Sequence, residues 1–208
     1  MFRLENLLER RPFLLNDAHL RQNPNNIKEW LNRVELCKSN KELIIETYEK
    51  AIKTVNNLKA FGKSELLYIN YAKYYESIND LEHANLIFYR GTQVHFRSLE
   101  QISSIWCEWC EMHLRCRNFK DAYSVIKTGC TTAAKTFYEN DQLKRVPSAS
   151  VSIKTWSLYA DLEEQLGTFQ NVKVMTILKY NNISGSLSTY DRFKDSYTSS
   201  NFELLRFS

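Results

Sequence analysis

The sequence predicts an all-α protein, an α-solenoid of stacked antiparallel helix pairs. Glycine (5) and proline (3) are scarce in the chain, whereas a sheet protein of this length needs more turn residues. Hydrophobic residues make up 43% of the chain. Three of the large aromatic residues, Trp30, Tyr68 and Trp106, follow one another at a constant interval of 38 residues. A fixed period of this size is typical of repeat proteins, in which neighbouring units bury each other's apolar faces.

Residues 1–24 are expected to form a helical lead-in, with helices at Phe2–Arg10 and Phe13–Gln22. The start, Met-Phe-Arg-Leu-Glu-Asn, is charged and lacks the apolar stretch of a secretory signal. No part of the chain approaches the roughly 18 apolar residues of a membrane span, so we expect no membrane partner. The five cysteines are therefore expected to be reduced thiols.

About four repeat units are expected in residues 25–170, near 26–57, 64–95, 98–138 and 150–179. The first helix of each unit carries a large aromatic residue, followed four positions later by a small or β-branched one. In three units a second aromatic lies three positions after the first. Positions i, i+3 and i+4 share one helix face, which we expect to be buried. The residues of this stripe are Trp30 and Val34; Tyr68, Tyr71 and Ala72; Trp106, Trp109 and Cys110; and Trp156, Tyr159 and Ala160.

Small residues mark a second helix in each of the first three units. Ala84 and Ala122 stand at the same distance after the aromatic of their units, and Gly91 and Gly129 follow each of them two helical turns later. Ala51 occupies the position of these glycines in the first unit. Small side chains let a helix approach its neighbour closely, so each second helix is expected to pack against the first.

Polar residues are placed where the helices should begin and end. Asn79-Asp80 and Asn118 fall between the two helices of a unit, where short polar side chains cap helices well. Ser64, and Ser98 together with Gln101, suit the starts of first helices. The fourth aromatic, Trp156, comes later than the period predicts, and the excess lies near residues 136–150.

Longer strings of residues carry a family resemblance. Arg11-Pro-Phe-Leu-Leu-Asn16, Leu20-Arg-Gln-Asn-Pro24 and Glu29-Trp30 lie in the first part of the chain, and Tyr71-Ala-Lys-Tyr-Tyr-Glu76 and Trp156-Ser-Leu-Tyr-Ala-Asp-Leu-Glu-Glu-Gln-Leu-Gly-Thr-Phe-Gln170 lie further on. With them, residues 2–170 resemble the SYF-type pre-mRNA-splicing factor family, which in animals is called the XPA-binding protein. Proteins of that family consist of HAT (half-a-TPR) repeats.

The resemblance implies a non-catalytic scaffold in the nucleus, working within the spliceosome. The partners it implies are other HAT-repeat scaffolds, an Aquarius-type helicase of the intron-binding complex and members of the Prp-nineteen complex. It also implies a link to transcription-coupled repair. The alternatives left open are a helical-repeat protein that contacts RNA and a TPR-like peptide receptor outside splicing.

The chain departs from the family in length and at its end. Family members are much longer arrays, so an internal fragment of such a protein is expected. After Gln170 the resemblance is expected to stop, and residues 171–208 form a divergent tail without the aromatic stripe. The serine- and asparagine-rich stretch Asn181–Ser188 is typical of a loop or a disordered segment.

One motif suggests metal or redox chemistry, Cys107-x-x-Cys110-x-x-His113-x-x-Cys116. On a single helix each three-residue step turns about 300°, so Cys107 and Cys116 end on roughly opposite faces and cannot close one tetrahedron. The repeat register also makes Cys110 the small packing residue of its unit. We therefore expect no metal, no cofactor and no enzymatic activity. The sequence contains no phosphate-binding glycine loop or nucleophile motif that would suggest otherwise.

Basic residues gather near the N-terminal end, which raises the question of RNA contact. No aromatic residues are interleaved with them for base stacking, and solvated helix faces often carry this many basic side chains. The net charge of +4 is mild, so protein–protein scaffolding is favoured over direct RNA binding. The basic residues are Arg10, Arg11, Arg21, Lys28 and Arg33.

Overall fold

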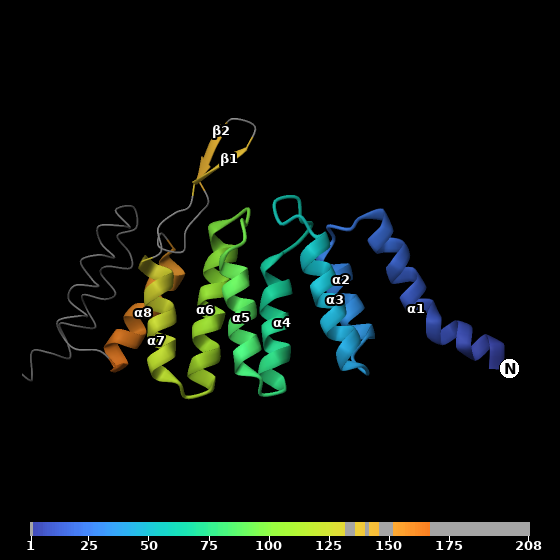
Figure 1. Ribbon diagram of the computed structural model, residues 1–208, viewed down its shortest axis with the longest axis horizontal. Helices are drawn as coiled ribbons and strands as arrows, with labels where there is room; N and C mark the ends of the chain where they lie inside the picture. Colours follow the sequence, from blue (N-terminus) through green and yellow to red (C-terminus); the bar gives the residue numbers. More distant parts are fainter. Residues whose placement is uncertain (1, 132–135, 140–141, 146–151, 167–208) are drawn as a thin grey trace, which may run out of the picture. The chain divides into compact units, whose positions relative to one another are not determined.

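The computed structural model describes residues 2–131, 136–139, 142–145 and 152–166 (Figure 1). The chain divides into two compact units, Met1–Thr155 and Trp156–Ser208. The all-α class is confirmed, with a two-stranded hairpin inserted late in the described part. The elements are α1 (Phe2–Gln22), α2 (Ile27–Leu36), α3 (Lys41–Thr54), α4 (Glu65–Ser77), α5 (Leu81–Thr92), α6 (Leu99–Arg115), α7 (Phe119–Thr131), β1 (Thr136–Glu139), β2 (Gln142–Arg145) and α8 (Ile153–Leu166).

Within the first unit, α2 to α7 form three antiparallel pairs, α2 with α3, α4 with α5 and α6 with α7 (Figure 1). We call α2, α4 and α6 the A helices and α3, α5 and α7 the B helices. A helices also contact the next A helix, α2 with α4 and α4 with α6. Each pair therefore buries an apolar face that it could not bury alone, as a solenoid requires.

The aromatic stripe lies in the core of these pairs. Trp30, Tyr68 and Trp106 are buried, and the half-buried Trp109 stacks on both Trp106 (ring centroids 5.5 Å apart) and Phe88 (6.1 Å). In the compact unit Trp156–Ser208, the rings of Trp156 and Tyr159 lie 6.1 Å apart and are buried, while Ala160 is half-buried. The remaining stripe and small residues Val34, Ala51, Tyr71, Ala72, Ala84, Cys110 and Ala122 are buried too.

The two B-helix glycines lie directly against the aromatic residues of their A helices. A Cβ atom at Gly129 would lie 2.9 Å from Cδ2 of Trp106, closer than carbon atoms pack. At Gly91 the nearest atoms, of Tyr68 and Ile105, would be 3.3 Å away. A hydrogen at these positions therefore lets the B helix reach the face of the aromatic ring.

The turn between the two helices of a unit repeats with the same backbone geometry. Asn79 has φ 60° and Arg117, one repeat period later, has φ 58°. In each turn the next N–H donates back into the A helix, Asp80 to the Tyr75 carbonyl (3.0 Å) and Asn118 to the His113 carbonyl (2.8 Å). This is a Schellman ending, which satisfies carbonyls at the end of a helix.

The predicted helix starts differ in how they are capped. Ser98 and Gln101 form a reciprocal capping box at the start of α6, and Asp80 accepts the His83 N–H (3.1 Å) at the start of α5. Ser64 precedes α4 as expected, but its side chain does not cap the helix. It is buried instead and accepts a hydrogen bond from Gln101 Nε2 (3.3 Å) of the next A helix.

The lead-in is a single helix, so the expectation of two helices separated near residues 11 and 12 is wrong. Helix α1 continues through Pro12, although an internal proline removes one hydrogen bond and kinks or breaks many helices. The half after Pro12 is held on α2, because Asn16 Nδ2 donates to the Glu29 carbonyl (2.8 Å) and Arg33 pairs with Asp17 (2.8 Å). These contacts keep the chain helical beyond the proline.

The third unit ends earlier than the predicted residue 138. Helix α7 stops at Thr131, and β1 then pairs antiparallel with β2 in the register Thr136↔Arg145 to Glu139↔Gln142. This hairpin lies in the part of the chain where the repeat interval lengthens before Trp156. Of the fourth unit, residues 152–166 are described and include α8, whereas residues 150–151 and 167–179 and the tail 171–208 lie outside the described residues. None of the described helices combines the length and apolarity needed to cross a membrane.

Replacing Gly129 by Ala is expected to destabilise the protein by about 1–3 kcal/mol, since the added methyl overpacks the Trp106 ring. Gly91→Ala is the matched comparison. Its contact is longer (3.3 against 2.9 Å), and the gain of about 1 kcal/mol in helix propensity offsets more of the strain. Urea denaturation measures both variants. Equal stabilities of the two would contradict the packing of Gly129 against Trp106.

Candidate protein-interaction surface

Polar side chains connect α4 to α6 along the whole length of the two A helices. At one end Gln101 Nε2 donates to Glu65 Oε2 (2.8 Å). In the middle Lys73 Nζ lies 2.8 Å from Glu108 Oε1. At the other end Arg115 donates two hydrogen bonds to the Glu76 carboxylate, from Nε (2.7 Å) and Nη2 (2.8 Å). The forked arginine pair fixes geometry as well as charge, so these three links set the register of one repeat on the next.

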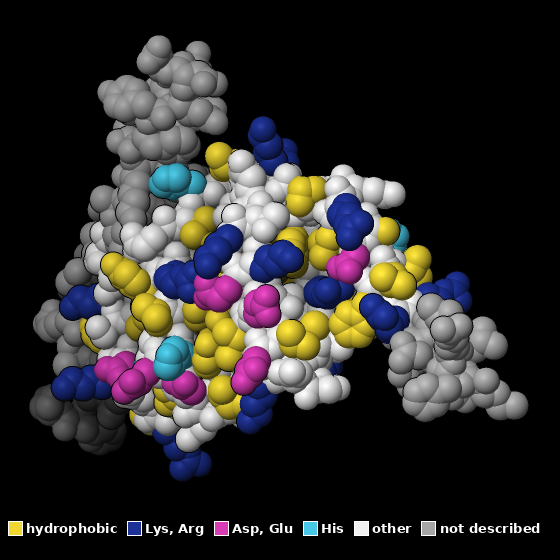
Figure 2. All heavy atoms as spheres, turned by 45° about the vertical axis from the view of Figure 1, so that its right-hand side comes forward, with side chains coloured by type: hydrophobic (Ala, Val, Ile, Leu, Met, Phe, Trp, Pro, Cys, Tyr) yellow, Lys and Arg dark blue, Asp and Glu magenta, His cyan; other side chains and the backbone are white. Residues whose placement is uncertain are grey.

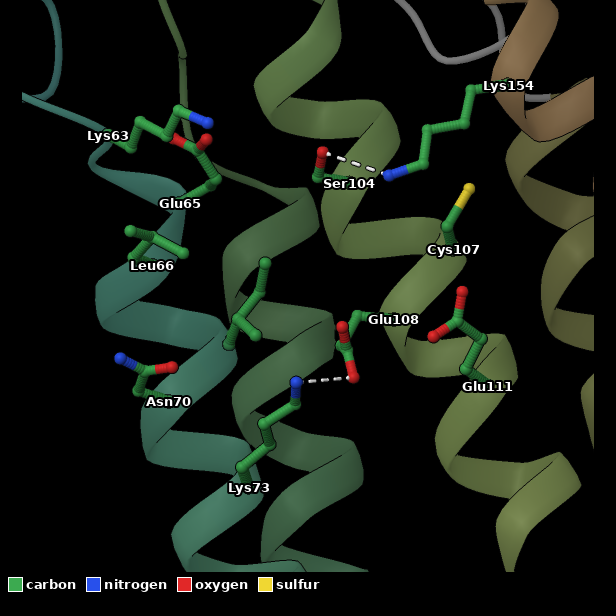
Figure 3. Close-up of a pocket in the computed structure, with 11 residues that line it drawn as sticks. Lys63, Glu65, Leu66, Asn70, Lys73, Ser104, Cys107, Glu108, Glu111 and Lys154 are labelled. Carbon is green, nitrogen blue, oxygen red and sulfur yellow. Dashed lines mark hydrogen bonds and ion pairs between the residues drawn. The ribbon is translucent and has the colours of Figure 1, made fainter.

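A groove of about 230 Å³ opens between α4 and α6. Figure 3 shows Lys73 of α4 reaching toward Glu108 of α6; Asn70 of α4 and Ser104 and Glu111 of α6 also line the groove. We call this the α4–α6 groove. Its lining includes three cations and three carboxylates, so its charge is balanced rather than suited to a purely acidic or basic ligand. These residues are Lys63, Lys73, Lys154, Glu65, Glu108 and Glu111.

Several polar groups of the α4–α6 groove are available to a ligand. Lys154 Nζ lies 3.5 Å from Ser104 Oγ, at the limit of a hydrogen bond, and among the described residues Glu111 makes only a long pair with Arg115 (3.9 Å). Asn70 lines the groove half-exposed, with both donor and acceptor on its amide. A groove with separated donors and acceptors of both signs suits an extended protein segment, whose backbone and side chains offer both.

A second inter-repeat link joins the B helices α3 and α5. Arg90 donates two hydrogen bonds to the Glu49 carboxylate (2.7 and 3.2 Å), and the Tyr71 hydroxyl donates a third (3.3 Å). The hydrogen bonds from Arg90 hold the pKa of Glu49 below its usual range. Burial, together with the neighbouring Tyr75 and Glu49, raises the pKa of the Tyr71 hydroxyl. Tyr71 also stacks on Tyr48 with ring centroids 4.7 Å apart.

The cysteine motif is spread around helix α6. Cys107, Cys110 and His113 are buried, whereas Cys116 is exposed at the C-cap. Burial raises the pKa of Cys107 to about 11 and that of Cys110 to about 12, and it lowers the pKa of His113. Cys110 donates to the Ala122 carbonyl of α7 (3.5 Å), which is a packing position. Within the described ranges no three His, Cys, Asp or Glu side chains are grouped as metal ligands.

The five N-terminal basic residues are not all exposed to a ligand. Arg33 is committed internally, because it pairs with Asp17 (2.8 Å) and lies over the Phe13 ring at 5.1 Å. Arg10, Arg11, Arg21 and Lys28 are exposed on α1 and α2. Figure 2 shows one face of the molecule, on which basic side chains lie among acidic and hydrophobic ones.

Sequence reasoning missed the residues that connect successive repeats. Glu49 with Arg90, and Glu76 with Arg115, are 41 and 39 residues apart, close to the repeat period. Opposite charges separated by one period could have indicated these pairs. Trp109 was predicted as a stripe residue, but not the hydrogen bond that its indole N–H donates to Asn85 (2.6 Å) of the preceding B helix. The α4–α6 groove was not predicted either, since it depends on how the two helices are spaced.

Residues 57–183 match the family model of the pre-mRNA-splicing factor Syf1/CRNKL1 C-terminal HAT repeat. The chain belongs to this HAT-repeat family. Residues 1–55 match a second model, the pre-mRNA-splicing factor SYF1 middle HAT repeat. The predicted family is therefore confirmed, and the match continues to residue 183, past the expected end at Gln170.

Comparison with curated relatives also supports membership of this family. The chain is 40% identical over 174 residues to the pre-mRNA-splicing factor syf1 homolog of Drosophila melanogaster, covering 83% of this chain and 20% of the relative. Identity to SYF1 of Dictyostelium discoideum is 39% over 177 residues (82% and 21%), and to human SYF1 38% over 174 residues (83% and 20%). The chain thus spans about a fifth of the length of these curated relatives.

Of the five thiols, only Cys116 is expected to react rapidly with iodoacetamide near neutral pH. The thiolate is the reactive form, and burial keeps Cys107, Cys110 and Cys130 protonated, with a pKa for Cys130 of about 12. Cys37 is buried too, so the reagent does not reach it in the native protein. Mass spectrometry should find one adduct in the native protein and five in denaturant. Rapid native modification of Cys110 would contradict its packing position.

The Glu49–Arg90 pair should stabilise the protein by about 1 kcal/mol, the upper end for partly exposed ion pairs. Because the pKa of Glu49 is lowered from 4.5, this contribution is complete above pH 4.5 and lost as pH falls through the lowered value. Arg90→Met should therefore be less stable than the parent at neutral pH and equally stable in strong acid. Urea denaturation at both pH values measures this, with Lys38→Met, at an exposed pair, as control. A difference that persists in acid would assign the effect to lost packing.

Proposed function

We propose that this chain is a non-catalytic scaffold segment in pre-mRNA splicing, which organises other proteins of the spliceosome in the nucleus. The names of its relatives, which are pre-mRNA-splicing factors in animals, a slime mould and fungi, support this proposal. The described part of the chain offers grooves and helix faces rather than a cluster of reactive groups. Its buried thiols have raised pKa values, and its partly buried carboxylates Glu49, Glu76 and Glu108 are used in ion pairs.

The observation that carries the proposal is the continuous packing of repeats across the junction of the two family matches, at residues 55–57. Tyr48 stacks on Tyr71 across that junction, and Glu49 pairs with Arg90. Backbone hydrogen bonds add to this, with Ile27 donating to the Phe61 carbonyl (3.2 Å). A stack connected in this way presents binding surfaces at fixed spacing to several partners at once.

We assign partner binding to the α4–α6 groove. Its polar groups of both signs suit a protein segment, whereas a strand of RNA would need a positively charged groove with aromatic side chains for stacking. For partners, the family resemblance points to other HAT-repeat scaffolds, an Aquarius-type helicase and members of the Prp-nineteen complex.

Affinity purification of the tagged chain from nuclear extract, with cross-linking mass spectrometry, tests this proposal. Spliceosomal proteins should dominate the cross-linked partners. Asn70→Arg should reduce their recovery several-fold, because the longer side chain occupies the α4–α6 groove. Asn32→Arg is the matched control, since Asn32 lies one period earlier, at the same position of its unit, and is exposed on α2.

Circular dichroism should show the same melting temperature for both variants, which separates a lost contact from a lost fold. Recovery of metabolic enzymes or membrane proteins alone would contradict the splicing role. Equal recovery of spliceosomal proteins by Asn70→Arg and Asn32→Arg would instead exclude the α4–α6 groove as their binding site.

A further inference from the structure

The loop between α3 and α4, residues 55–63, is held in place by α2 and the turn before it. Asn25 Oδ1 accepts the Asn56 N–H (2.9 Å), and the Asn25 carbonyl accepts the Phe61 N–H (2.9 Å). The Phe61 carbonyl accepts the Ile27 N–H (3.2 Å), so residues 26 and 61 form a parallel β-bridge. We call this segment the 55–63 loop; its backbone is fixed at both ends, and it is seen in teal in Figure 1.

Two apolar side chains of the 55–63 loop face solvent. Phe61 is 70% exposed, and Leu58 is 38% exposed. Gly62, with φ 109°, directly follows Phe61 and allows a turn that other residues rarely adopt. A large aromatic side chain on a pre-ordered backbone gains contact area on binding at little cost in conformational entropy. Such residues often dominate the binding energy of an interface.

The charged residues within the 55–63 loop, Lys59 and Lys63, are both cations. No Asp or Glu occurs between Lys50 and Glu65, whereas Lys59 and Lys63 lie in the loop and are exposed. Lys28, which follows the bridge residue Ile27, is exposed as well. The neighbouring carboxylates are already used within the protein. Glu29 accepts from Asn16 (3.1 Å), Glu49 from Arg90 (2.7 Å) and Glu65 from Gln101 (2.8 Å).

We propose that the 55–63 loop is a docking element for an acidic segment of a partner protein that carries a large apolar side chain. The apolar side chain would pack on Phe61 and Leu58, and its flanking carboxylates would pair with the lysines. This inference goes beyond the splicing scaffold role, because it assigns a second surface and the chemistry of its ligand whatever process the partner serves.

The same features favour an acidic protein segment over a nucleic acid. Binding of single strands relies on several stacking aromatics along a basic groove, often with arginine. The 55–63 loop offers one exposed aromatic, Phe61, and one exposed aliphatic side chain, Leu58, and its cations are both lysine. It also projects Phe61 into solvent instead of lining a groove with it. An apolar residue between carboxylates is the ligand that matches this surface.

A random peptide library selected on the full chain tests the proposal, with counter-selection on Phe61→Ser. Peptides that need Phe61 should be net negative and carry at least one large apolar residue. Fluorescence anisotropy should then show at least about tenfold weaker binding of such a peptide to Phe61→Ser, as expected for a central aromatic contact. Lys59→Glu, at the loop lysine that does not also line the α4–α6 groove, should weaken it as well, and salt should weaken binding to the parent protein.

Leu86→Ser is the control, because Leu86 is an exposed apolar residue (53%) on α5, away from the loop sequence. Its affinity for the peptide should equal that of the parent. Phe61-dependent peptides that are neutral or basic, no Phe61-dependent peptides, or tighter Phe61-dependent binding of a uridine oligonucleotide would each overturn the proposal. Peptide binding that persists when no spliceosomal partner is recovered from nuclear extract would count against the splicing role alone.

Discussion

Contact between a large aromatic ring of one helix and a glycine of its partner sets the spacing inside the repeats, and much of the structure depends on it. Trp106 leaves room at Gly129 for a hydrogen but not for a methyl group, and Tyr68 lies almost as close to Gly91. Since protein interiors are close-packed, this distance cannot relax without opening a void or forcing a rotamer change. The 38-residue interval between Tyr68 and Trp106 therefore corresponds to one packing contact that recurs in two successive repeats.

Correct spacing within a pair makes the polar links between pairs possible. Arg115 reaches Glu76, and Arg90 reaches Glu49, with both hydrogen bonds of a fork. A forked pair tolerates little displacement, so the aromatic core must first hold the helices in place. The links then fix the register from repeat to repeat, and with it the α4–α6 groove, while hydrogen bonds with Asn25 and Ile27 hold the backbone of the 55–63 loop. Both candidate binding surfaces are consequences of the core rather than additions to it.

The cysteine motif shows how the repeat register decides between chemical readings. Cys-x-x-Cys with a following histidine has the residue types of a zinc or redox site. Yet Cys110 stands at the position of Ala72 in the preceding unit, is fully buried and packs on the Ala122 carbonyl. Burial stabilises its thiol form, which is the opposite of what a metal ligand or a redox nucleophile requires. Without its position in the repeat, the cysteine motif would have suggested a zinc or redox site, although its side chains are spread around the helix.

The sequence by itself determined the all-α class, the repeat period, the buried aromatic stripe, the capping box at Ser98 and the family, because each depends on residues close in the chain or on a regular pattern. It failed at Pro12, where contacts of α1 with α2 outweigh one lost hydrogen bond, and at the hairpin after α7. Only the tertiary structure decided which charges pair between repeats, where the α4–α6 groove opens and that Phe61 is held exposed. Those features arise between segments about one repeat apart in the chain, where partner and distance depend on the packed core and not on local sequence.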